Sequence, residues 1–321
     1  MYKRHAKYRS AAFAAEVRRL APTADVVVCD FLAPAVNVPE QLPVPTVLFQ
    51  HNVEAEIWRR HAEVGGNPVV RGYFHRQWQR MLRFEAAACR RFDQVIAVSE
   101  ADATLMAEAY GVEGVAAVPT GVDVEYFRPQ QEQPRSPREL VFTGSMDWLP
   151  NEDGVTWFAE QVLPRVQAEV DDATFTVVGR NPSPKVLDLA RRCPGVTVTG
   201  TVPDIRPYLA RGVALVVPLR IGGGTRLKIF EAMAMGVPVI STTVGAEGLP
   251  LQPGTHLLEA DTPEALTAAC VGLLRDPAAA AALGDRGAQY VQSQFGWDRV
   301  AGEFAALCAQ TAALLPQRSM A

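Results

Sequence analysis

The sequence contains little that would support a disulfide scaffold, a metal centre or a membrane span. Its five cysteines are scattered, odd in number and without a Cys-x-x-Cys spacing, so we expect buried free thiols in a reducing compartment. Histidine and cysteine do not cluster, and we expect no bound metal. No apolar run approaches the length of a membrane span, and the stretch from Ala11 to Ala15 is too short for a signal-peptide core.

A large charge of one sign is also lacking. The net charge of −4 over 321 residues provides no global field that favours nucleic acid, so we expect no nucleic-acid partner. Together with the missing spans, this predicts a cytoplasmic protein. The length permits two α/β domains, and a hydrophobic content of 48% is sufficient for two cores.

Segments typical of buried strands alternate with helical segments, a pattern that indicates parallel sheets built from β-α-β units. In the first part we expect strands at 25–30, 45–50 and 94–98, and helices at 68–91 and 100–110. In the second part we expect strands at 140–143, 173–178, 196–199, 214–217 and 237–240, with helices between them. Three more helices should follow, at 263–274, 277–295 and about 297–315.

The domain boundary is predicted in the stretch 129–137, which is polar and rich in proline, the composition of a linker. We therefore expect a first Rossmann-like domain, with its linker, over residues 1–135. A second domain should cover 136–296, and a terminal helix 297–321. Nothing before Asp25 reads as a strand, so the first domain is expected to be short.

The most informative segment runs from Gly222 to Ile240 and reads as a glycine loop, a short helix, a glycine stop and a buried strand. Glycines let a backbone approach a ligand closely, and the following helix start offers unpaired N–H groups to a phosphate. Arg226 and Lys228 place two cations where the helix dipole alone favours anions. The segment predicts a nucleoside-diphosphate site; the alternative is a plain loop–helix–strand connection with a solvated Arg–Lys pair.

This segment resembles the donor-site signature of glycosyltransferase family 4, whose members have the GT-B fold, and is most similar to sugar transferases of exopolysaccharide systems. Residues 95–102 resemble the family's strand that ends in Ser-Glu, and 140–151 the opening of its C-terminal domain. Residues 118–123, with Phe127, resemble a Pro-Asn-Gly-Val-Asp turn in which Thr120 replaces Asn. The resemblance covers nearly all of the chain from about residue 24.

The resemblance implies an α/β GT-B fold, in which two Rossmann-like parallel-sheet domains face one another across a cleft. It makes residues 1–135 the acceptor-side domain and 136–296 the nucleotide-sugar domain, with the helix 297–321 crossing back onto the first. A complete first domain of the family begins with a strand and a glycine-rich loop. We find neither here and expect an incomplete domain, whether by natural truncation or by a start set too late.

The activity implied is that of a retaining, metal-independent hexosyltransferase in polysaccharide or glycoconjugate biosynthesis. It would move a sugar from a nucleotide diphosphate-sugar, its co-substrate and not a cofactor, to a glycan or lipid-linked acceptor. One alternative is a catalytically impaired GT-B remnant that serves as a binding or assembly subunit. Another is a nucleotide-sugar epimerase, which needs acid–base carboxylates and histidines around the sugar that we do not find.

The resemblance assigns the donor diphosphate to Arg226 and Lys228. Most relatives carry an Arg and a Lys after the first strand of the second domain, where this chain has Gly144-Ser145 and, further on, neutral Pro150 and Asn151. Glu231 matches the second of two family glutamates and is expected to hold the ribose. Glycine replaces the first at Gly223, so the donor sugar is expected to meet backbone N–H groups of Gly222, Gly223, Gly224 and Thr225.

His51 is the remaining catalytic candidate. It follows an apolar strand, and the carboxyl end of a parallel strand is where ligands bind in open α/β sheets, although a lone histidine is usually structural. The resemblance gives it a contact with the transferred sugar or the acceptor hydroxyl. It also points to the backbone of Val202 for binding the base.

Two basic helices complete the prediction. Six arginines lie on the long helix of the first part and six cations near the chain start: Arg71, Arg76, Arg80, Arg83, Arg90, Arg91, Lys3, Arg4, Lys7, Arg9, Arg18 and Arg19. They are either solvated faces or a surface that docks on anionic phospholipid, at the inner face of the membrane, as would suit a lipid-linked acceptor.

Overall fold

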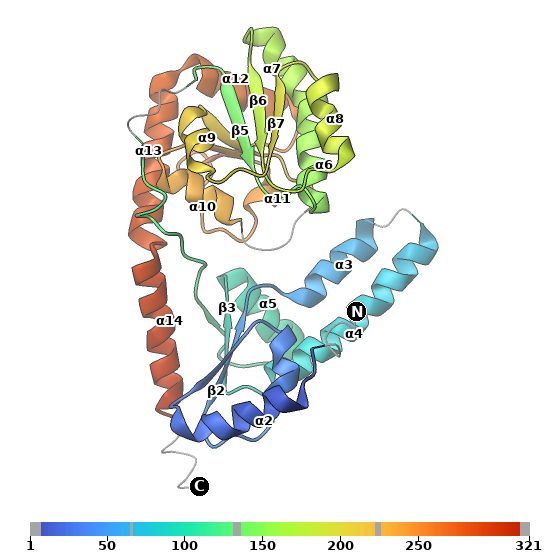
Figure 1. Ribbon diagram of the computed structural model, residues 1–321, viewed down its shortest axis with the longest axis vertical. Coiled ribbons are helices and arrows are strands. Elements are labelled where there is room, and N and C mark those ends of the chain that lie inside the picture. The colour runs from blue at the N-terminus through green and yellow to red at the C-terminus, as the bar shows by residue number, and fades with distance from the viewer. Residues whose placement is uncertain (1–7, 65–66, 131–135, 222–225, 315–321) are drawn as a thin grey trace. The chain divides into compact units, whose positions relative to one another are not determined.

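The computed structural model describes residues 8–64, 67–130, 136–221 and 226–314 of the chain (Figure 1). Contacts divide these residues into two compact units. The first holds the described residues of Met1–Thr120 and Val300–Ala321, and the second those of Gly121–Gly222 and Arg226–Arg299. Each unit is built around a parallel sheet of its own and is described by itself.

The sheet of the first unit has four strands in sequence order: β1 (Val27–Asp30), β2 (Thr46–Gln50), β3 (Gln94–Ala97) and β4 (Ala116–Ala117). All neighbours pair in parallel. The β-branched residues of β2 and β3 suit a pleated, packed surface. Val47 and Leu48 point to opposite faces and both are fully buried, so both faces of this sheet are covered.

One face of this sheet packs against α14 (Trp297–Ala312), and the other against α4 (Pro68–Cys89) and α5 (Glu100–Tyr110). On the first face the ring of Phe304 lies 5.0 Å from that of Phe49, and Val300 and Leu307 pack near Val47. On the second, Leu48 shares a cluster with Met106 and Cys89. Three shorter elements, α2 (Ala11–Leu20), η1 (Ala21–Thr23) and η2 (Ala33–Asn37), and the helix α3 (Glu54–Val64) complete the unit.

A buried carboxylate, Glu85 of α4, joins three elements of the first unit. Its oxygens accept hydrogen bonds from the backbone N–H groups of Glu54 (3.0 Å) and Ala55 (2.8 Å), which belong to the first turn of α3. They also accept from the Tyr110 hydroxyl of α5 (2.6 Å) and from the Gln50 amide of β2 (3.3 Å). Glu85 therefore satisfies helix-start donors that would otherwise be buried without partners, and it fixes the chain that leaves β2.

The sheet of the second unit is larger. Its strands are β5 (Glu139–Thr143), β6 (Thr174–Val178), β7 (Val196–Gly200), β8 (Ala214–Val217), β9 (Val239–Ser241) and β10 (Leu258–Glu259). They lie in the order β10-β9-β8-β5-β6-β7, all parallel. The chain thus builds outward from β5 in one direction and then returns to β8 on its other side. In a doubly wound sheet, ligands bind at the carboxyl ends of the strands where the order reverses.

Helices surround this second sheet. They are α6 (Leu149–Trp157), α7 (Leu163–Glu169), α8 (Pro184–Arg192), α9 (Arg206–Arg211), α10 (Leu227–Ala234), α11 (Thr243–Ala246), α12 (Pro263–Arg275) and α13 (Pro277–Gln294). A π-helical turn, η3 (Phe158–Val162), joins α6 to α7. It precedes Pro164, which has no N–H to continue an α-helical ladder.

The predicted α/β class and every predicted strand are confirmed, with ends that differ by at most two residues. The two-residue strands β4 and β10 escaped the sequence prediction, because a segment so short carries no period. Among the described helices, none is long and apolar enough by itself to cross a membrane. Only α12 and α13, which meet at a 104° bend, pass that test of length and composition together.

The substitution Glu85→Gln tests the buried carboxylate. Its amide nitrogen would face two of the four donors, and two buried donors without acceptors lower the free energy of unfolding by about 2–5 kcal/mol. Burial raises the pKa of Glu85 from 4.5 to about 7, against the opposing effect of its hydrogen bonds. Between these values the native carboxyl keeps a proton that the unfolded chain has lost, so its contribution to stability falls as the pH rises through this window.

Urea unfolding at pH 5, 6, 7 and 8 measures both effects. We expect the variant to be less stable throughout and to lack the part of the pH dependence that Glu85 supplies to the wild type. Glu63→Gln on α3 is the control, because Glu63 is an exposed partner of Arg59 and should change stability by less than about 1 kcal/mol. An unchanged pH dependence in Glu85→Gln would contradict the assignment.

Candidate functional site

The reversal point of the second sheet brings most of the predicted donor residues together. Gly144 and Ser145 directly follow β5, and Arg226 and Lys228 stand at the start of α10, which follows β8. Since β5 and β8 are hydrogen-bonded neighbours, the chain segments that leave their carboxyl ends meet at this edge. Residues Gly222, Gly223, Gly224 and Thr225 lie outside the described residues.

Lys228 is held by side chains from the other side of the reversal point. Its Nζ donates a hydrogen bond to Oδ1 of Asn151 at 3.1 Å and lies 4.0 Å from the ring centre of Phe142. Asn151 is buried at the start of α6, and its Nδ2 donates to the Ser145 carbonyl at 2.8 Å. Burial of the amine, helped by the nearby Arg226 and opposed by Glu231, lowers the pKa of Lys228 to about 7.

Gly144 makes this close approach possible. A Cβ atom at this position would lie 2.7 Å from Nζ of Lys228, 2.8 Å from Nδ2 of Asn151 and 3.2 Å from the Phe142 ring. Its neighbour across the sheet, Gly179, is equally constrained, because a Cβ there would overlap the Gly144 carbonyl oxygen. The two glycines allow the ends of β5 and β6 to touch and leave room for the lysine amine.

Arg226 and Glu231 flank Lys228 on α10. Arg226 is the N-cap residue of this helix and is only 3% exposed, and its guanidinium carbon lies 5.4 Å from the ring centre of Trp148. Burial raises the pKa of Glu231, while Lys228 counteracts the rise. The alternative of a solvated Arg–Lys pair is therefore wrong, because Arg226 is buried and Lys228 has the Asn151 amide as a partner. Cations withdrawn from water act more strongly on a nearby anion.

The other two donor-side predictions lie further along the same edge. Ser145 donates its hydroxyl hydrogen to Oδ1 of Asp147 at 2.5 Å and accepts a hydrogen bond from Nε of Arg180 at 2.9 Å. Val202 follows β7, where its side chain packs against the core of the second unit.

His51 belongs to the first unit, where it directly follows β2. Its Nε2 lies 2.6 Å from Oδ1 of Asp30, the last residue of β1. The imidazole stacks on the ring of Phe31 at 3.9 Å and contacts that of Phe49 at 4.4 Å. Phe31 has a φ of +70°, which is unusual for a bulky residue and holds its ring beneath the imidazole. A carboxylate at one ring nitrogen fixes the orientation and tautomer of the other.

Sequence reasoning missed three residues of these arrangements: Asp30, Arg180 and the role of Asn151. Asp30 and Arg180 could have been found, because each stands at the carboxyl end of a predicted strand, the same signal that identified His51. The role of Asn151 depends on the pairing of β5 with β8, which no local pattern contains. No group of three or more potential metal ligands is found in the part of the chain that the structure describes.

Comparisons with known families match both parts of the chain. The family described as Glycosyltransferase Family 4 matches residues 2–126, and the one described as Glycosyl transferases group 1 matches residues 137–276. The two matched segments are separated by residues 127–136, which overlap the predicted linker at 129–137.

Curated relatives are all distant in sequence. An MMP α-(1→4)-mannosyltransferase from Mycolicibacterium hassiacum is 26% identical over 261 residues, which are 77% of this chain and 61% of the relative. A GDP-mannose-dependent α-(1-6)-phosphatidylinositol monomannoside mannosyltransferase from Mycobacterium tuberculosis is 28% identical over 66% of this chain and 60% of the relative. The chain therefore spans about three fifths of the length of the curated relatives that it matches.

Solved structures establish the GT-B fold. TarM from S. aureus has a TM-score of 0.72 at 12% identity, over 92% of this chain and 57% of that chain. Sucrose-phosphate synthase from Thermosynechococcus elongatus has a TM-score of 0.71 at 20% identity, over 94% and 77%. HepE from Anabaena, solved in complex with UDP, has a TM-score of 0.69 at 15% identity, over 92% and 82%. At these identities the likeness concerns the fold alone.

The substitution Gly144→Ala tests the close approach to Lys228. The added methyl group would displace the amine or the Asn151 side chain, and overpacking of this kind costs about 1–3 kcal/mol. Gly272→Ala in α12 is a matched control in the same unit, because a Cβ there meets nothing within 4 Å. In a helix interior that change should stabilise by up to about 1 kcal/mol. If thermal unfolding shows the same change of Tm in the two variants, the packing described for Gly144 is contradicted.

Proposed function

The chain belongs to glycosyltransferase family 4, and on this basis we propose that it transfers a sugar from a nucleotide diphosphate-sugar to a glycan or lipid-linked acceptor. The observation that carries the proposal is the pair of cations, Arg226 and Lys228, at the reversal point of the second sheet. Both are withdrawn from bulk water: Arg226 is only 3% exposed, and burial lowers the pKa of Lys228. They supply positive charge where an open α/β sheet binds its ligand.

Two cations suit the chemistry of this transfer. When the bond between the sugar's anomeric carbon and the phosphate oxygen breaks, negative charge grows on the departing diphosphate. Arg226 and Lys228 would stabilise that charge without a bound metal, Arg226 by its planar fork and Lys228 as a point charge. We propose a retaining reaction on one face of the sugar, in which the leaving phosphate takes the proton of the acceptor hydroxyl.

We propose that Glu231 holds hydroxyls of the donor ribose and that Gly144, Ser145 and the Val202 backbone contact the rest of the nucleotide. In the first unit, His51 would contact the transferred sugar or the acceptor hydroxyl. The carboxylate of Asp30 would then keep the His51 imidazole in one orientation, because it is the partner of Nε2. A hexose donor is supported by the names of the two curated relatives described above, both mannosyltransferases and one of them GDP-mannose-dependent. It is also supported by HepE, which was solved with UDP and glucose.

Donor binding should depend on pH through Lys228. A diphosphate beside the amine favours its charged form, so binding raises the pKa of Lys228 above its free value of about 7 and takes up a proton. Affinity should therefore fall as the pH rises from 7 to 9, by up to tenfold per unit. Isothermal titration calorimetry with UDP- and GDP-hexoses, in buffers of different ionisation enthalpy, measures both the affinity and the proton uptake.

The substitution Lys228→Met should abolish the proton uptake and weaken donor binding about 10- to 100-fold, in line with the loss of one charge-assisted contact. Lys185→Met on α8 is the matched control, because Lys185 is an exposed lysine of the same unit. His51→Ala should retain donor binding but lose sugar transfer. If the wild type binds nucleotide sugars yet neither transfers nor hydrolyses them, the protein is a binding subunit and the proposed reaction is wrong.

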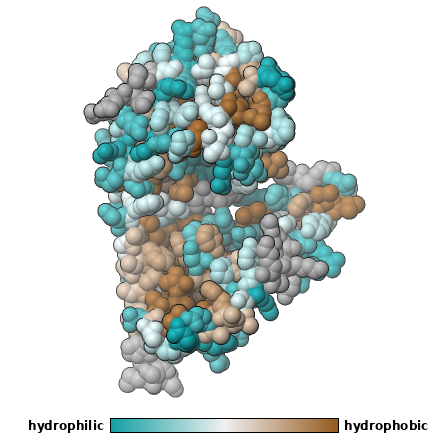
Figure 2. All heavy atoms as spheres, in the orientation of Figure 1, coloured by the Kyte–Doolittle hydropathy of each residue, from teal (hydrophilic) through white to brown (hydrophobic). Residues whose placement is uncertain are grey.

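We also propose that α4 contacts an anionic membrane surface. Val69 and Tyr73 near its start are 79% and 54% exposed. The side chains of four arginines on this helix form no hydrogen bond or ion pair with other described residues: Arg71, Arg76, Arg80 and Arg83. Figure 2 shows hydrophobic and hydrophilic residues mixed over the hairpin of α3 and α4. Apolar side chains beside unneutralised cations are typical of helices that lie on anionic lipid.

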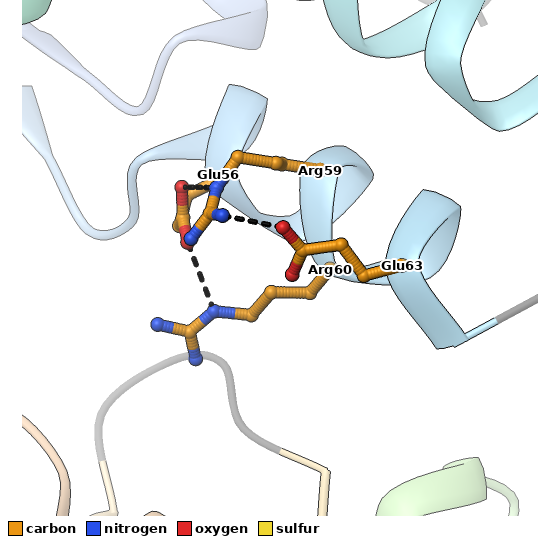
Figure 3. Close-up of polar contacts among 4 residues, drawn as sticks. All are labelled: Glu56, Arg59, Arg60 and Glu63. Atoms are coloured by element: carbon orange, nitrogen blue, oxygen red, sulfur yellow. Dashed lines mark hydrogen bonds and ion pairs between the residues drawn. The ribbon is translucent and has the colours of Figure 1, made fainter.

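The acidic residues of the neighbouring helix do not cancel this charge. On α3, Glu56 is paired with Arg59 and Arg60, and Glu63 with Arg59, as Figure 3 shows. Two other predicted surface cations have structural partners instead: Arg90 donates to the Tyr110 carbonyl, and Arg91 to the carbonyls of Ala35 and Val38. Lys3, Arg4 and Lys7 lie outside the described residues.

Sedimentation with vesicles of phosphatidylglycerol and phosphatidylcholine tests the surface. Arg76→Gln with Arg80→Gln removes two charges one helical turn apart, each worth about 1 kcal/mol near anionic lipid, so partitioning should fall about 30-fold at low ionic strength. Arg191→Gln with Arg192→Gln on α8 removes the same net charge from residues that are already ion-paired. Equal losses in the two double variants would show a non-specific charge effect and contradict the proposal.

A further inference from the structure

Arg180 occupies the same carboxyl edge of the second sheet as the two proposed diphosphate residues. It follows β6 directly after Gly179, whose missing side chain lets the backbone of Gly144 come into contact. The Lys228 amine lies close to Gly144, where a Cβ would meet it at 2.7 Å. Arg180 is hydrogen-bonded to the hydroxyl of the next residue, Ser145. Two cations are thus placed by two consecutive residues of the chain.

The guanidinium of Arg180 is oriented by a small network. Its Nε donates to Oγ of Ser145 at 2.9 Å, and that hydroxyl donates in turn to Asp147 at 2.5 Å. Asn181 donates to the second oxygen of Asp147 at 3.0 Å, and the Arg180 carbonyl accepts from the N–H of Met146 at 2.9 Å. The network holds the arginine through Nε only. Arg180 is exposed, and its two Nη groups make no hydrogen bond with other residues that the structure describes.

The environment of Arg180 differs from that of most arginines in the second unit. Eight of them form salt bridges with carboxylates of the unit: Arg138, Arg165, Arg191, Arg192, Arg206, Arg211, Arg220 and Arg275. Hydrogen bonds from Ser145 and Asn181 lower the pKa of Asp147, and the charge of Arg180 adds a smaller effect, yet the direct hydrogen bond of Arg180 goes to a neutral hydroxyl. An arginine that is oriented but not neutralised is suited to an external anion, and its fork matches a phosphate.

We propose that Arg180 binds a phosphate of the nucleotide donor, with Ser145 as the positioning residue that aims its guanidinium. The inference rests on the proposed function, since it assigns a third cation to the same diphosphate. Lys228, near Gly144, and Arg180, on Ser145, would then both hold the diphosphate, and Arg226 adds charge from α10.

Calorimetry with nucleoside diphosphates tests the assignment. The wild type is first titrated with ADP, GDP, UDP and dTDP, and the nucleotide that binds most tightly is then used for the variants. Arg180→Gln should weaken its binding about 10- to 100-fold, as expected for the loss of charge-assisted hydrogen bonds. Arg180→Lys should lose less of this affinity than Arg180→Gln, and Ser145→Ala should weaken nucleotide binding about threefold to tenfold. Inorganic pyrophosphate should compete with the nucleotide in the wild type and much less in Arg180→Gln.

Two controls separate charge from structure. Asp147→Asn disturbs the same network without removing the cation, so diphosphate affinity should stay within threefold of the wild type or improve. Arg191→Gln removes an arginine that is paired with Asp188 on α8 and should change nothing. Unaltered thermal unfolding of Arg180→Gln would show that the exposed substitution leaves the fold intact.

The outcomes are distinct. If the wild type binds a nucleoside diphosphate and Arg180→Gln binds it equally well, the assignment of Arg180 is wrong while the proposed function stands. If Asp147→Asn weakens binding as much as Arg180→Gln, the turn and not the cation matters, and the assignment is again wrong. If the wild type binds none of the four nucleotides, both the proposed function and this inference are overturned.

Discussion

The site of the second unit depends on the absence of a side chain at Gly144. That one missing methyl group lets the Lys228 amine cross from α10 to the end of β5, where Asn151 and the ring of Phe142 receive it. A lysine placed there loses much of its hydration, and so its pKa falls to about 7. The fold thereby keeps a cation that responds to a bound anion, because an anion restores the stabilisation that water would have given.

The first unit also buries an ionisable group, in this case the acidic side chain of Glu85. Glu85 is buried because the donors of α3, α5 and β2 converge on its two oxygens. The chain between β2 and α3 contains His51, so the network that satisfies the helix start also fixes the segment that carries the imidazole. In both units, a buried ionisable group positions the residues at the carboxyl end of a parallel sheet, and the cost of burying it is offset by hydrogen bonds.

Much of this arrangement could be predicted from local patterns. Continuous apolar runs located the strands of both sheets, and the glycine-rich segment from 222 to 240 led to Arg226, Lys228 and Glu231. Side-chain partners were beyond such reasoning, since Asn151 reaches Lys228 only through the pairing of β5 with β8. The basic helix shows the same limit: six arginines look alike in the sequence, but Arg90 and Arg91 bind backbone carbonyls of distant segments.

The packing of α14 on the first sheet has a consequence for biosynthesis. Val47, Ile96 and Val118 are made early, whereas Val300, Phe304 and Leu307, which cover them, follow about two hundred residues later. A chain that emerges from the ribosome from its amino end therefore leaves one face of this sheet uncovered while the whole second unit is made. Such a face is a binding site for chaperones and a source of aggregation. The second unit can complete its own core before these residues are covered, so we expect closure of the first sheet to come late in folding.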